Sequence, residues 1–426
     1  MNERLLQFIW QFQYFNKDNL RTIDDLPLQI LKPGTLNTNQ GPDFLDAQIK
    51  LNNTLWAGNI EIHILGSDWN LHGHSNDPNY SNVILHVVWE NNSAVVLSGG
   101  QTIPTIEMQP LIAKTMLETY YRLMQQDQFV SCTKHLPALS DIAWVSWKER
   151  LAVERLLRKS SGVIDLVKKS NNHWEETFWW LLARNFGIKL NSEVFEEIAV
   201  SIPLNVLAKH KSQIHQLEAL LFGQAGLLND EREDDYYRLL QREYKLLSTK
   251  FNLRSVGRKP DLLRMRPANF PTVRLAQLAM LIHHSNHMFS RVLEANHCRQ
   301  LYSLLNVTTN DYWHYHYRFG ETTAYHPKTL GKTMAENILI NTIIPVLYAY
   351  GQHKKIEAIQ ERAVAFLSQI SAEKNTITRN WEKYGIANLT ALDSQALIEL
   401  KNSYCNKHLC LECAVGNKIL RSDKTA

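Results

Sequence analysis

The sequence of 426 residues lacks several features that would assign it to a specialised class of protein. No hydrophobic run approaches the roughly 18 apolar residues that cross a bilayer, and residues 1–4 do not resemble the start of a signal peptide. Only five cysteines occur, three of them between positions 405 and 413, which does not resemble a disulfide framework. These absences predict a cytoplasmic protein that does not associate with a membrane.

Composition and length are typical of a folded protein with more than one domain. Hydrophobic residues make up 44% and charged residues 21% of the chain, close to the averages for globular proteins, which excludes a largely disordered chain. A chain of 426 residues is long enough for two or three domains, each with its own core.

Positive charge is scarce in the N-terminal part of the chain. Residues 1–110 contain five Lys and Arg against eleven Asp and Glu, a net charge of −6, and no Lys or Arg occurs between Lys50 and Lys114. The remainder has 41 basic against 31 acidic residues, a net charge of +10. An acidic part that binds cations, joined to a basic part that binds phosphates, is one arrangement expected of a metal-dependent enzyme acting on nucleic acid.

Hydrophobic periodicity predicts an α+β protein in three parts: an α/β domain over residues 1–110, a helical domain over residues 111–400 and a tail over residues 401–426. The first domain is predicted to contain a helix, a hairpin with an Asn-Asn turn, a polar loop and a strand buried on both faces. The predicted ranges are 2–15 for the helix, 44–51 and 55–65 for the hairpin, 66–82 for the loop and 83–89 for the buried strand.

Two carboxylates are predicted to meet on this hairpin. Asp43 opens the first strand, and Glu61 lies late in its antiparallel partner. His63, two residues after Glu61, points to the same face of the sheet. We expect Asp43 and Glu61 to bind Mg²⁺ or Mn²⁺, with the carbonyl of Ile62 as a further oxygen ligand. Such a cation activates a water and stabilises the charge on a phosphate under attack.

The order helix, strand, Pro-Asp, hairpin, Glu-x-His and strand resembles the core of the PD-(D/E)XK nuclease superfamily. The resemblance implies a restriction-endonuclease-like mixed sheet in which Asp43 and Glu61 hold magnesium and Glu3 supplies an extra acid from the first helix. It also implies that His63 stands where a Lys orients the attacking water in that superfamily. A neutral His differs from a permanently charged Lys, and Lys50 is expected to face away from Asp43.

The chain as a whole resembles a bacterial family catalogued as domain of unknown function DUF2851. The resemblance spans nearly the full length and implies no particular activity. It rests on residues 41–47, 58–63 and 67–69, on His72 and His74, on the strand around His86, on residues 266–274 and on the terminal cysteines.

A second candidate site is a group of polar side chains around and after Glu61. Four of its members are histidines within 24 residues, and His and Asp at this density can bind zinc, manganese or iron or supply a general base. The alternative is structural, with one His in the core and the others bonded within the loop. The members are His63, His72, His74, Asp77, Tyr80 and His86.

The C-terminal cysteines form a third candidate site. Cys405, Cys410 and Cys413 are spaced C-x4-C-x2-C, which can hold a structural Zn²⁺ or an iron–sulfur cluster. Three reduced, buried thiols are the alternative. The fourth ligand of a metal would be His408, Cys298 or Cys132.

A basic segment follows in the predicted helical domain. It contains six cations in 21 residues against one acid, and such a segment can follow a nucleic-acid backbone. The alternative is a solvated loop whose arginines pair with acids elsewhere. The six cations are Arg254, Arg258, Lys259, Arg264, Arg266 and Arg274.

These patterns favour metal-dependent phosphodiester hydrolysis on nucleic acid, with Asp43, Glu61 and His63 as catalytic residues. Two other functions fit the same residues. One is a non-catalytic module that binds nucleic acid or protein and has lost turnover with its Lys. The other is a zinc hydrolase built on the histidines, without nucleic acid.

Overall fold

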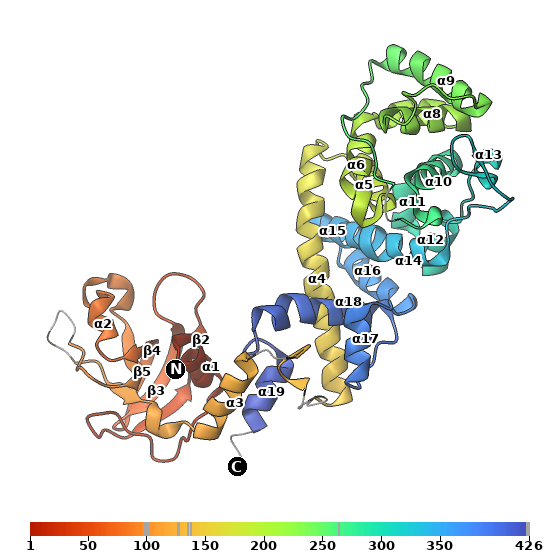
Figure 1. The fold of residues 1–426 in the computed structure, drawn as a ribbon. Coiled ribbons are helices and arrows are strands. Elements are labelled where there is room, and N and C mark those ends of the chain that lie inside the picture. The colour runs from red at the N-terminus through yellow and green to blue at the C-terminus, as the bar shows by residue number, and fades with distance from the viewer. Residues whose placement is uncertain are drawn as a thin grey trace. The chain divides into compact units, whose positions relative to one another are not determined.

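The computed structural model describes residues 1–96, 100, 102–125, 128–133, 136, 139–262, 265–285 and 287–422. The chain divides into two compact units, each of which is described by itself (Figure 1). The domain limits predicted after residues 110 and 400 stay a prediction. The first unit comprises Met1–Trp144, Lys383–Ile386 and Leu400–Ala426, and the second comprises Val145–Glu382 and Ala387–Glu399.

The first unit contains a mixed sheet of six strands, in agreement with the predicted α+β class. The strand order is β1-β3-β4-β5-β6, with β2 paired to β3. Strands β1, β3 and β4 are antiparallel neighbours, whereas β5 runs parallel to both β4 and β6. The strands are β1 (Leu28–Lys32), β2 (Thr35–Leu36), β3 (Phe44–Leu51), β4 (Thr54–Leu65), β5 (Val83–Glu90) and β6 (Thr105–Glu107).

The predicted hairpin is confirmed as β3 and β4. Asn52 and Asn53, with φ of +44° and +69°, form a two-residue turn of the kind that matches the twist of antiparallel strands. At the other end of β3 the pairing is irregular between Phe44 and Ala47, where Asp46 has φ of +56°. This irregular start of β3 lies beside the end of β4 that carries Glu61.

The strand predicted to be buried on both faces is confirmed as β5. Its residues from Val83 to Val88 are all buried, because parallel neighbours flank it on either side. The predicted loop 66–82 is more structured than expected, since a parallel connection needs a crossover. It contains the short helix α2 (Asp68–Leu71) and two single turns, η1 (His74–Asn76) and η2 (Pro78–Tyr80).

Helix α1 (Glu3–Phe12) packs against β4 through a buried face that includes Leu5, Leu6 and Ile9. The side chain of Asn2 caps the helix by accepting a hydrogen bond from the Leu5 N–H at 2.8 Å. The helix is shorter than the predicted 2–15, because Gln13 adopts a left-handed conformation that ends it.

In the rest of the first unit, the N-terminal segment of the chain contacts the C-terminal segment. Tyr14, just after α1, donates a hydrogen bond to Asn417 Oδ1 at 2.7 Å, and the last helix packs against α3. The elements are η3 (Gln109–Leu111), α3 (Lys114–Met124), η7 (Leu400–Tyr404), η8 (Cys405–Lys407) and α19 (Ala414–Ser422).

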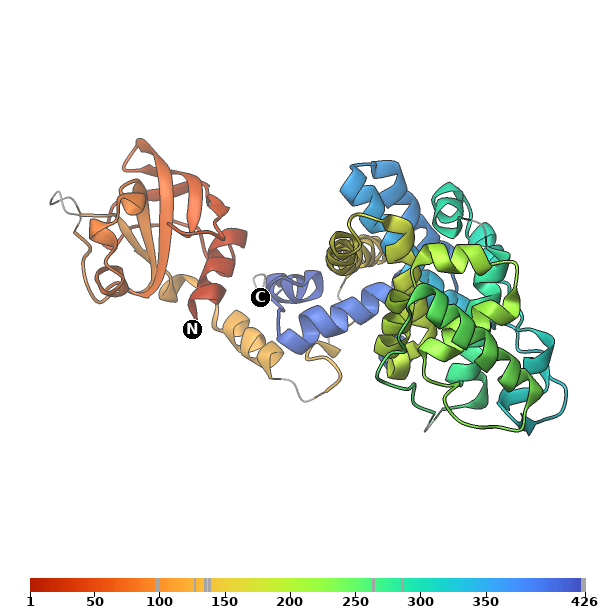
Figure 2. The same ribbon diagram turned by 90° about the horizontal axis from the view of Figure 1, so that it is seen from above.

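The second unit is mainly helical, as predicted for this part of the chain (Figure 2). Among the described residues, no helix is long and apolar enough to cross a bilayer. Its helices are α4 (Asp141–Lys169), α5 (Trp174–Phe186), α6 (Ile188–Ser201), α7 (Leu204–His210), α8 (Ile214–Gln224), α9 (Asp235–Phe251), α10 (Pro271–His284), α11 (Met288–Glu294), α12 (Cys298–Leu304), α13 (Asp311–His314), α14 (Lys332–Ile338), α15 (Ile344–Lys354), α16 (Glu357–Gln369), α17 (Thr376–Lys383) and α18 (Ala391–Glu399), with the 3₁₀ turn η5 (Pro267–Asn269), the π-helix η6 (Leu339–Ile343) and the strands β7 (His316–Arg318) and β8 (Glu321–Thr322).

Candidate metal centre

Asp43 and Glu61 are held together by hydrogen bonds between the start of β3 and the end of β4. The Asp43 N–H donates to Glu61 Oε2 at 3.1 Å, and the Ile62 N–H donates to Asp43 Oδ2 at 3.1 Å. Gln7, on α1, donates from Nε2 to Asp43 Oδ1 at 2.8 Å. The predicted meeting of the two carboxylates is therefore present, with their positions fixed by the backbone of both strands.

His63 lies on the same face of β4 as Glu61, as the alternation of side chains predicts. Its Nε2 is 3.5 Å from Glu61 Oε1 and 3.2 Å from His72 Nδ1. Its Nδ1 is 2.9 Å from Nε2 of His86, a fully buried residue on β5. His86 therefore fixes the orientation of the His63 ring, as a buried partner of a ligating imidazole typically does.

The crossover adds two more imidazoles to this group. His72 follows α2 and His74 begins η1. Nitrogens of His63, His72 and His74 all lie within 4.8 Å of one another. His74 Nε2 also lies 3.4 Å from Glu61 Oε1 and is buried without a hydrogen bond. Three imidazole nitrogens thus form one group, and a carboxylate oxygen of Glu61 lies within 3.5 Å of two of them.

This donor set fits a first-row transition metal. Imidazole suits zinc, copper, iron and nickel, whereas a site made only of oxygens suits magnesium or calcium. Asp43 is already engaged by Ile62 and Gln7, so Glu61 is the carboxylate that faces the imidazoles. The predicted ligation of Mg²⁺ or Mn²⁺ by Asp43 and Glu61 stays a prediction. We call His63, His72, His74 and Glu61 the His–Glu cluster.

Burial shifts the pKa values of two carboxyls and of two imidazoles in and beside this cluster. Burial, followed by repulsion from Glu3, raises the pKa of Asp43 to about 7, and burial with repulsion from Asp43 raises the pKa of Glu61 to about 9. Burial and the neighbouring imidazoles lower the pKa of His63 to about 4 and that of His86 to about 3. Unprotonated imidazoles offer their lone pairs, and a bound cation would relieve the repulsion between the carboxylates.

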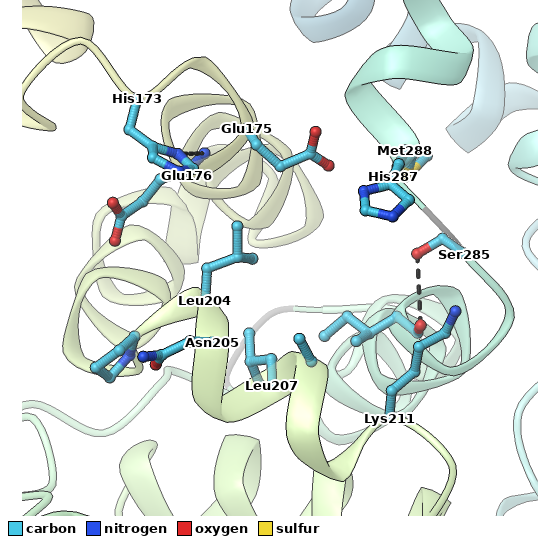
Figure 3. A pocket seen from close by; sticks show the side chains of 13 residues that line it. His173, Glu175, Glu176, Leu204, Asn205, Leu207, Lys211, Ser285, His287 and Met288 are labelled. Atoms are coloured by element: carbon cyan, nitrogen blue, oxygen red, sulfur yellow. Dashed lines mark hydrogen bonds between the residues drawn. The ribbon is translucent and has the colours of Figure 1, made fainter.

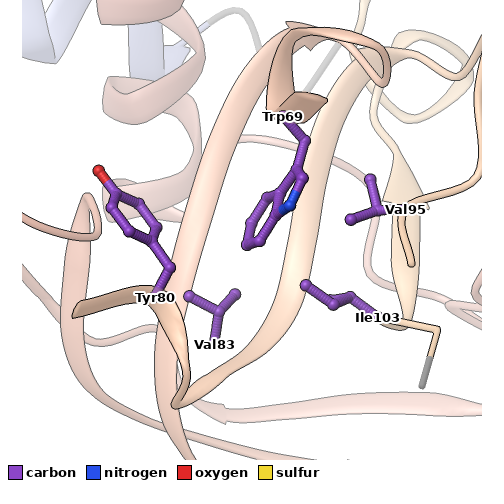
Figure 4. Close-up of a cluster of buried hydrophobic side chains, with 5 residues drawn as sticks. All are labelled: Trp69, Tyr80, Val83, Val95 and Ile103. Carbon is purple, nitrogen blue, oxygen red and sulfur yellow. The ribbon is translucent and has the colours of Figure 1, made fainter. Parts of the chain in front are cut away.

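An aromatic layer holds the crossover on the sheet. Trp69, on α2, is fully buried and lies with Tyr80, Val83, Val95 and Ile103 in one hydrophobic cluster (Figure 4). The Trp69 Nε1–H donates to Ser75 Oγ at 3.0 Å. Tyr80, the second aromatic ring of this layer, stacks on the imidazole of His74, with ring centres 3.8 Å apart.

The other predicted cleft residues lie around the cluster in different roles. Glu3, on α1, is close enough to repel Asp43 and to attract His72 electrostatically. Asp77 is half-buried, and its side chain accepts a hydrogen bond from the Asn79 N–H at 2.9 Å, which caps η2. Sequence analysis did not identify Gln7, although Gln7 lies one helical turn after Glu3 and shares its face, and Trp69 was part of the family resemblance without a predicted role.

The basic segment lies in the second unit and splits into exposed and buried residues. Arg258 lies 3.5 Å from Glu193, Lys259 lies 3.9 Å from Asp230, and both are exposed, as is Arg266. Arg264 lies outside the described residues.

Arg274 differs from Arg258, Lys259 and Arg266 because its side chain is buried in α10. Its guanidinium donates hydrogen bonds to Gln277 Oε1 and Asn269 Oδ1. Burial lowers its pKa to about 10. In this conformation Arg274 supports the local structure and does not present its charge on the surface.

The second unit also contains a cavity of about 660 Å³ near the start of α5 (Figure 3). Its polar groups serve the local structure, because His173 Nδ1 accepts from the Glu176 N–H and Glu175 Oε1 accepts from the Phe289 N–H. No sequence pattern identified this cavity.

The three predicted terminal cysteines come together in the first unit. Cys405, Cys410 and Cys413 line one small cavity, and Cys132 lines it as well. His408 does not line this cavity, and Cys298 belongs to the second unit.

Fold and site together define an α+β protein with a candidate His–Glu metal centre. The chain belongs to the family described as Protein of unknown function (DUF2851), whose sequence pattern matches residues 3–376. The match includes the whole His–Glu cluster but ends before the terminal cysteines, which had contributed to the resemblance seen in the sequence. No curated protein and no solved structure matches the chain significantly. The likeness to PD-(D/E)XK nucleases accordingly stays a hypothesis.

Proposed function

We propose that this protein is a metal-dependent hydrolase that cleaves phosphodiester bonds in nucleic acid. The observation that carries the proposal is that three imidazoles gather beside Glu61 and Asp43 at the end of β4. A second support is the order of elements, in which α1 precedes an antiparallel hairpin and a crossover leads to parallel strands. That order is similar to the core implied by the nuclease resemblance.

In this proposal the His–Glu cluster holds the cation, which would lower the pKa of a bound water and stabilise the charge developing on a phosphate. Asp43 lies beside the cluster with a pKa near neutrality, where a carboxylate is an efficient acceptor of the proton from an attacking water. Gln7 and the Ile62 N–H orient the two Asp43 oxygens.

The role of His63 differs from the one implied by the nuclease resemblance. A Lys in that position acts through its permanent positive charge, whereas the pKa of His63 is lowered to about 4 and the ring is neutral at pH 7. We therefore assign His63 to ligation through Nε2. On the second unit, the exposed Arg258, Lys259 and Arg266 are the proposed phosphate-binding residues.

The three-imidazole group also supports a second candidate function, a zinc hydrolase that does not act on nucleic acid. Three protein nitrogens or oxygens with one open position are typical of catalytic zinc sites. In this candidate the three imidazoles would hold the zinc and Glu61 would face the open position, so the two candidates share the imidazoles and differ in substrate. A phosphodiester test with several metals therefore separates them.

The test is cleavage of supercoiled plasmid, single-stranded DNA and RNA by chelator-treated protein resupplied with Mg²⁺, Mn²⁺ or Zn²⁺. We expect cleavage with at least one metal and a loss of about 10²-fold or more in Glu61→Gln and Asp43→Asn. The matched control is Asp46→Asn, because Asp46 is exposed on the same strand and Asn tolerates its φ of +56°.

The outcomes separate the alternatives. Cleavage that both site variants retain would contradict the proposed centre. Binding of nucleic acid without cleavage would favour the non-catalytic module. If nucleic acid is neither bound nor cleaved, while Zn²⁺-dependent hydrolysis of small esters is lost in Glu61→Gln, the zinc hydrolase is the correct function.

A further inference from the structure

Four of the five cysteines line one cavity of about 20 Å³ in the first unit. Cys405 belongs to η8, Cys410 lies in the following turn, and Cys413 directly precedes α19. Cys132 comes from a segment more than 270 residues earlier in the chain. None of the four forms a disulfide, and their accessible surface is small or intermediate.

The chain around the three terminal cysteines turns back on itself tightly. His408 adopts a left-handed conformation after Cys405, and the Leu409 N–H then bonds to the Tyr404 carbonyl at 3.0 Å. Gly416 is required for the next approach, because a Cβ at this position would lie 2.1 Å from the Cys410 carbonyl oxygen. The turn brings Cys405 and Cys410, which are five positions apart, to the same cavity.

Two backbone N–H groups point at one of the sulfurs, although burial raises the pKa of all four thiols. The Gly416 and Val415 N–H groups donate hydrogen bonds to the Cys413 sulfur and lower its pKa, although burial raises it more. Backbone N–H groups at the start of a helix favour negative charge on such a sulfur. Burial and the nearby thiols of Cys413 and Cys410 raise the pKa of Cys132 to about 12, so the four sulfurs are close enough to repel one another as thiolates.

We propose that Cys132, Cys405, Cys410 and Cys413 together hold a thiophilic metal centre, either one zinc ion or an iron–sulfur cluster. Both centres take four cysteine thiolates. Sequence spacing supplies only three of them, and the fourth is Cys132, which the fold delivers to the same cavity. A bound metal would neutralise the charge of the four thiolates, and this allows them to lie together in a buried cavity.

Such a centre would link the terminal segment to the residues that follow α3. Its role would be structural, because four protein ligands leave no open position on zinc for a substrate. The proposal is independent of the phosphodiesterase proposal. The two sites use different residues and different donor atoms.

The test uses the full chain with His72→Ala and His74→Ala, so that the His–Glu cluster does not contribute bound metal. Protein purified anaerobically without chelator is analysed for zinc, iron and acid-labile sulfide. We expect about one zinc per chain or about four iron and four sulfide per chain. Adding Cys132→Ser is expected to remove at least half of that metal, whereas adding Cys298→Ser leaves it unchanged.

Cys298→Ser is the matched control because Cys298 is a buried thiol, as Cys413 is, but lies in the second unit, where it donates to the Phe366 carbonyl. A second measurement guards against unfolding of the Cys132 variant. Co²⁺ added to the metal-free parent chain should give the intense thiolate-to-cobalt charge-transfer band that imidazole and carboxylate ligands do not give. A parent chain without zinc, iron or this band would overturn the proposal, as would metal content unchanged by Cys132→Ser.

Discussion

At the scale of single residues, the two oxygens of the Glu61 carboxylate have different partners. Its Oε2 accepts the Asp43 N–H and so fastens β3 to β4, while its Oε1 faces His63 and His74. The side chain is only 4% exposed, so its charge needs a partner. In the absence of metal, that partner is a proton.

The stability of the metal-free protein should therefore fall as the pH rises from 6.5 to 9. The folded pKa values of Glu61 and Asp43, about 9 and about 7, lie above their ordinary values of 4.5 and 3.8, so the folded state binds more protons. Their contribution to stability is complete at low pH and is lost as the pH rises through the folded pKa values. His63 and His86 have lowered pKa values and act in the opposite sense only below about 6.5.

The expected loss is roughly 1–3 kcal/mol of unfolding free energy, measured by urea denaturation of chelator-treated protein. Glu61→Gln should flatten the profile between pH 7 and 9, and Asp46→Asn should leave it as in the wild type. A slope that Glu61→Gln does not change would show that Glu61 is not the titrating group.

His86 should matter for metal binding without touching the metal. It contacts Nδ1 of His63 and leaves Nε2 free to face the cluster. His86→Phe keeps a buried ring but removes this contact, and loss of such a partner typically weakens metal affinity about 10–100-fold. Competition with a chromophoric chelator measures the change, with the exposed His284→Gln as control. Unchanged Zn²⁺ affinity in His86→Phe would contradict the assigned orientation of His63.

At the scale of elements, the crossover between β4 and β5 decides whether the imidazoles converge. Only His63 and His86 are on strands, whereas His72 and His74 depend on α2 and η1. Those short elements are held by Trp69, which packs on the sheet and bonds to Ser75. A few residues of helix have little stability of their own, so the packing of Trp69 sets the conformation of the segment.

Trp69→Ala is expected to cost about 3–5 kcal/mol of stability because it removes a fully buried aromatic side chain. The Zn²⁺ affinity of the folded protein should fall as well, because His72 and His74 lose the packing that holds them in place. The control is Leu71→Ala in the same helix, whose side chain is 80% exposed. Thermal unfolding and a Zn²⁺ titration of the folded protein measure the two effects. A Trp69→Ala protein with wild-type Zn²⁺ affinity would contradict this role of the crossover.

The same elements show how far the sequence could predict the structure. Local signals were sufficient for the existence of the β3–β4 hairpin and its Asn-Asn turn, whereas the irregular pairing between Phe44 and Ala47 was not predicted. They also placed Glu61 and His63 on one face. The convergence of His72 and His74 could not be predicted, since it depends on how Trp69 packs with Val83, Val95 and Ile103, which no local sequence pattern indicates. The burial of Arg274 and the meeting of Cys132 with the terminal cysteines depend on tertiary contacts in the same way.

At the scale of the whole molecule, the first unit is assembled from both ends of the chain. Val415 and Leu420, on α19, are almost fully buried, and Tyr14 is hydrogen-bonded to Asn417. Residues after position 399 therefore complete the unit that contains the sheet. The family match, which stops at residue 376, includes the His–Glu cluster but not this last segment.

A chain that ends after Glu399 should lose stability in the first unit while the second unit keeps its own. Removing α19 exposes the apolar surface that Val415 and Leu420 cover, and it breaks the bond to Tyr14. Hydrogen exchange should show faster exchange in β4 and β5 and unchanged protection in α8. A chain that ends after Ser422 serves as control. Equal protection of β4 in both truncated chains would contradict the assignment of α19 to the first unit.

Anomalous diffraction from crystals grown with Zn²⁺ would show whether Glu61 and the three imidazoles form one metal site. We expect a single strong anomalous peak among Glu61 Oε1, His63 Nε2, His72 Nδ1 and His74 Nε2. The peak should be absent from crystals of Glu61→Gln protein grown in the same way. A peak bound only by Asp43, Glu61 and the Ile62 carbonyl, or no peak near β4, would contradict the account.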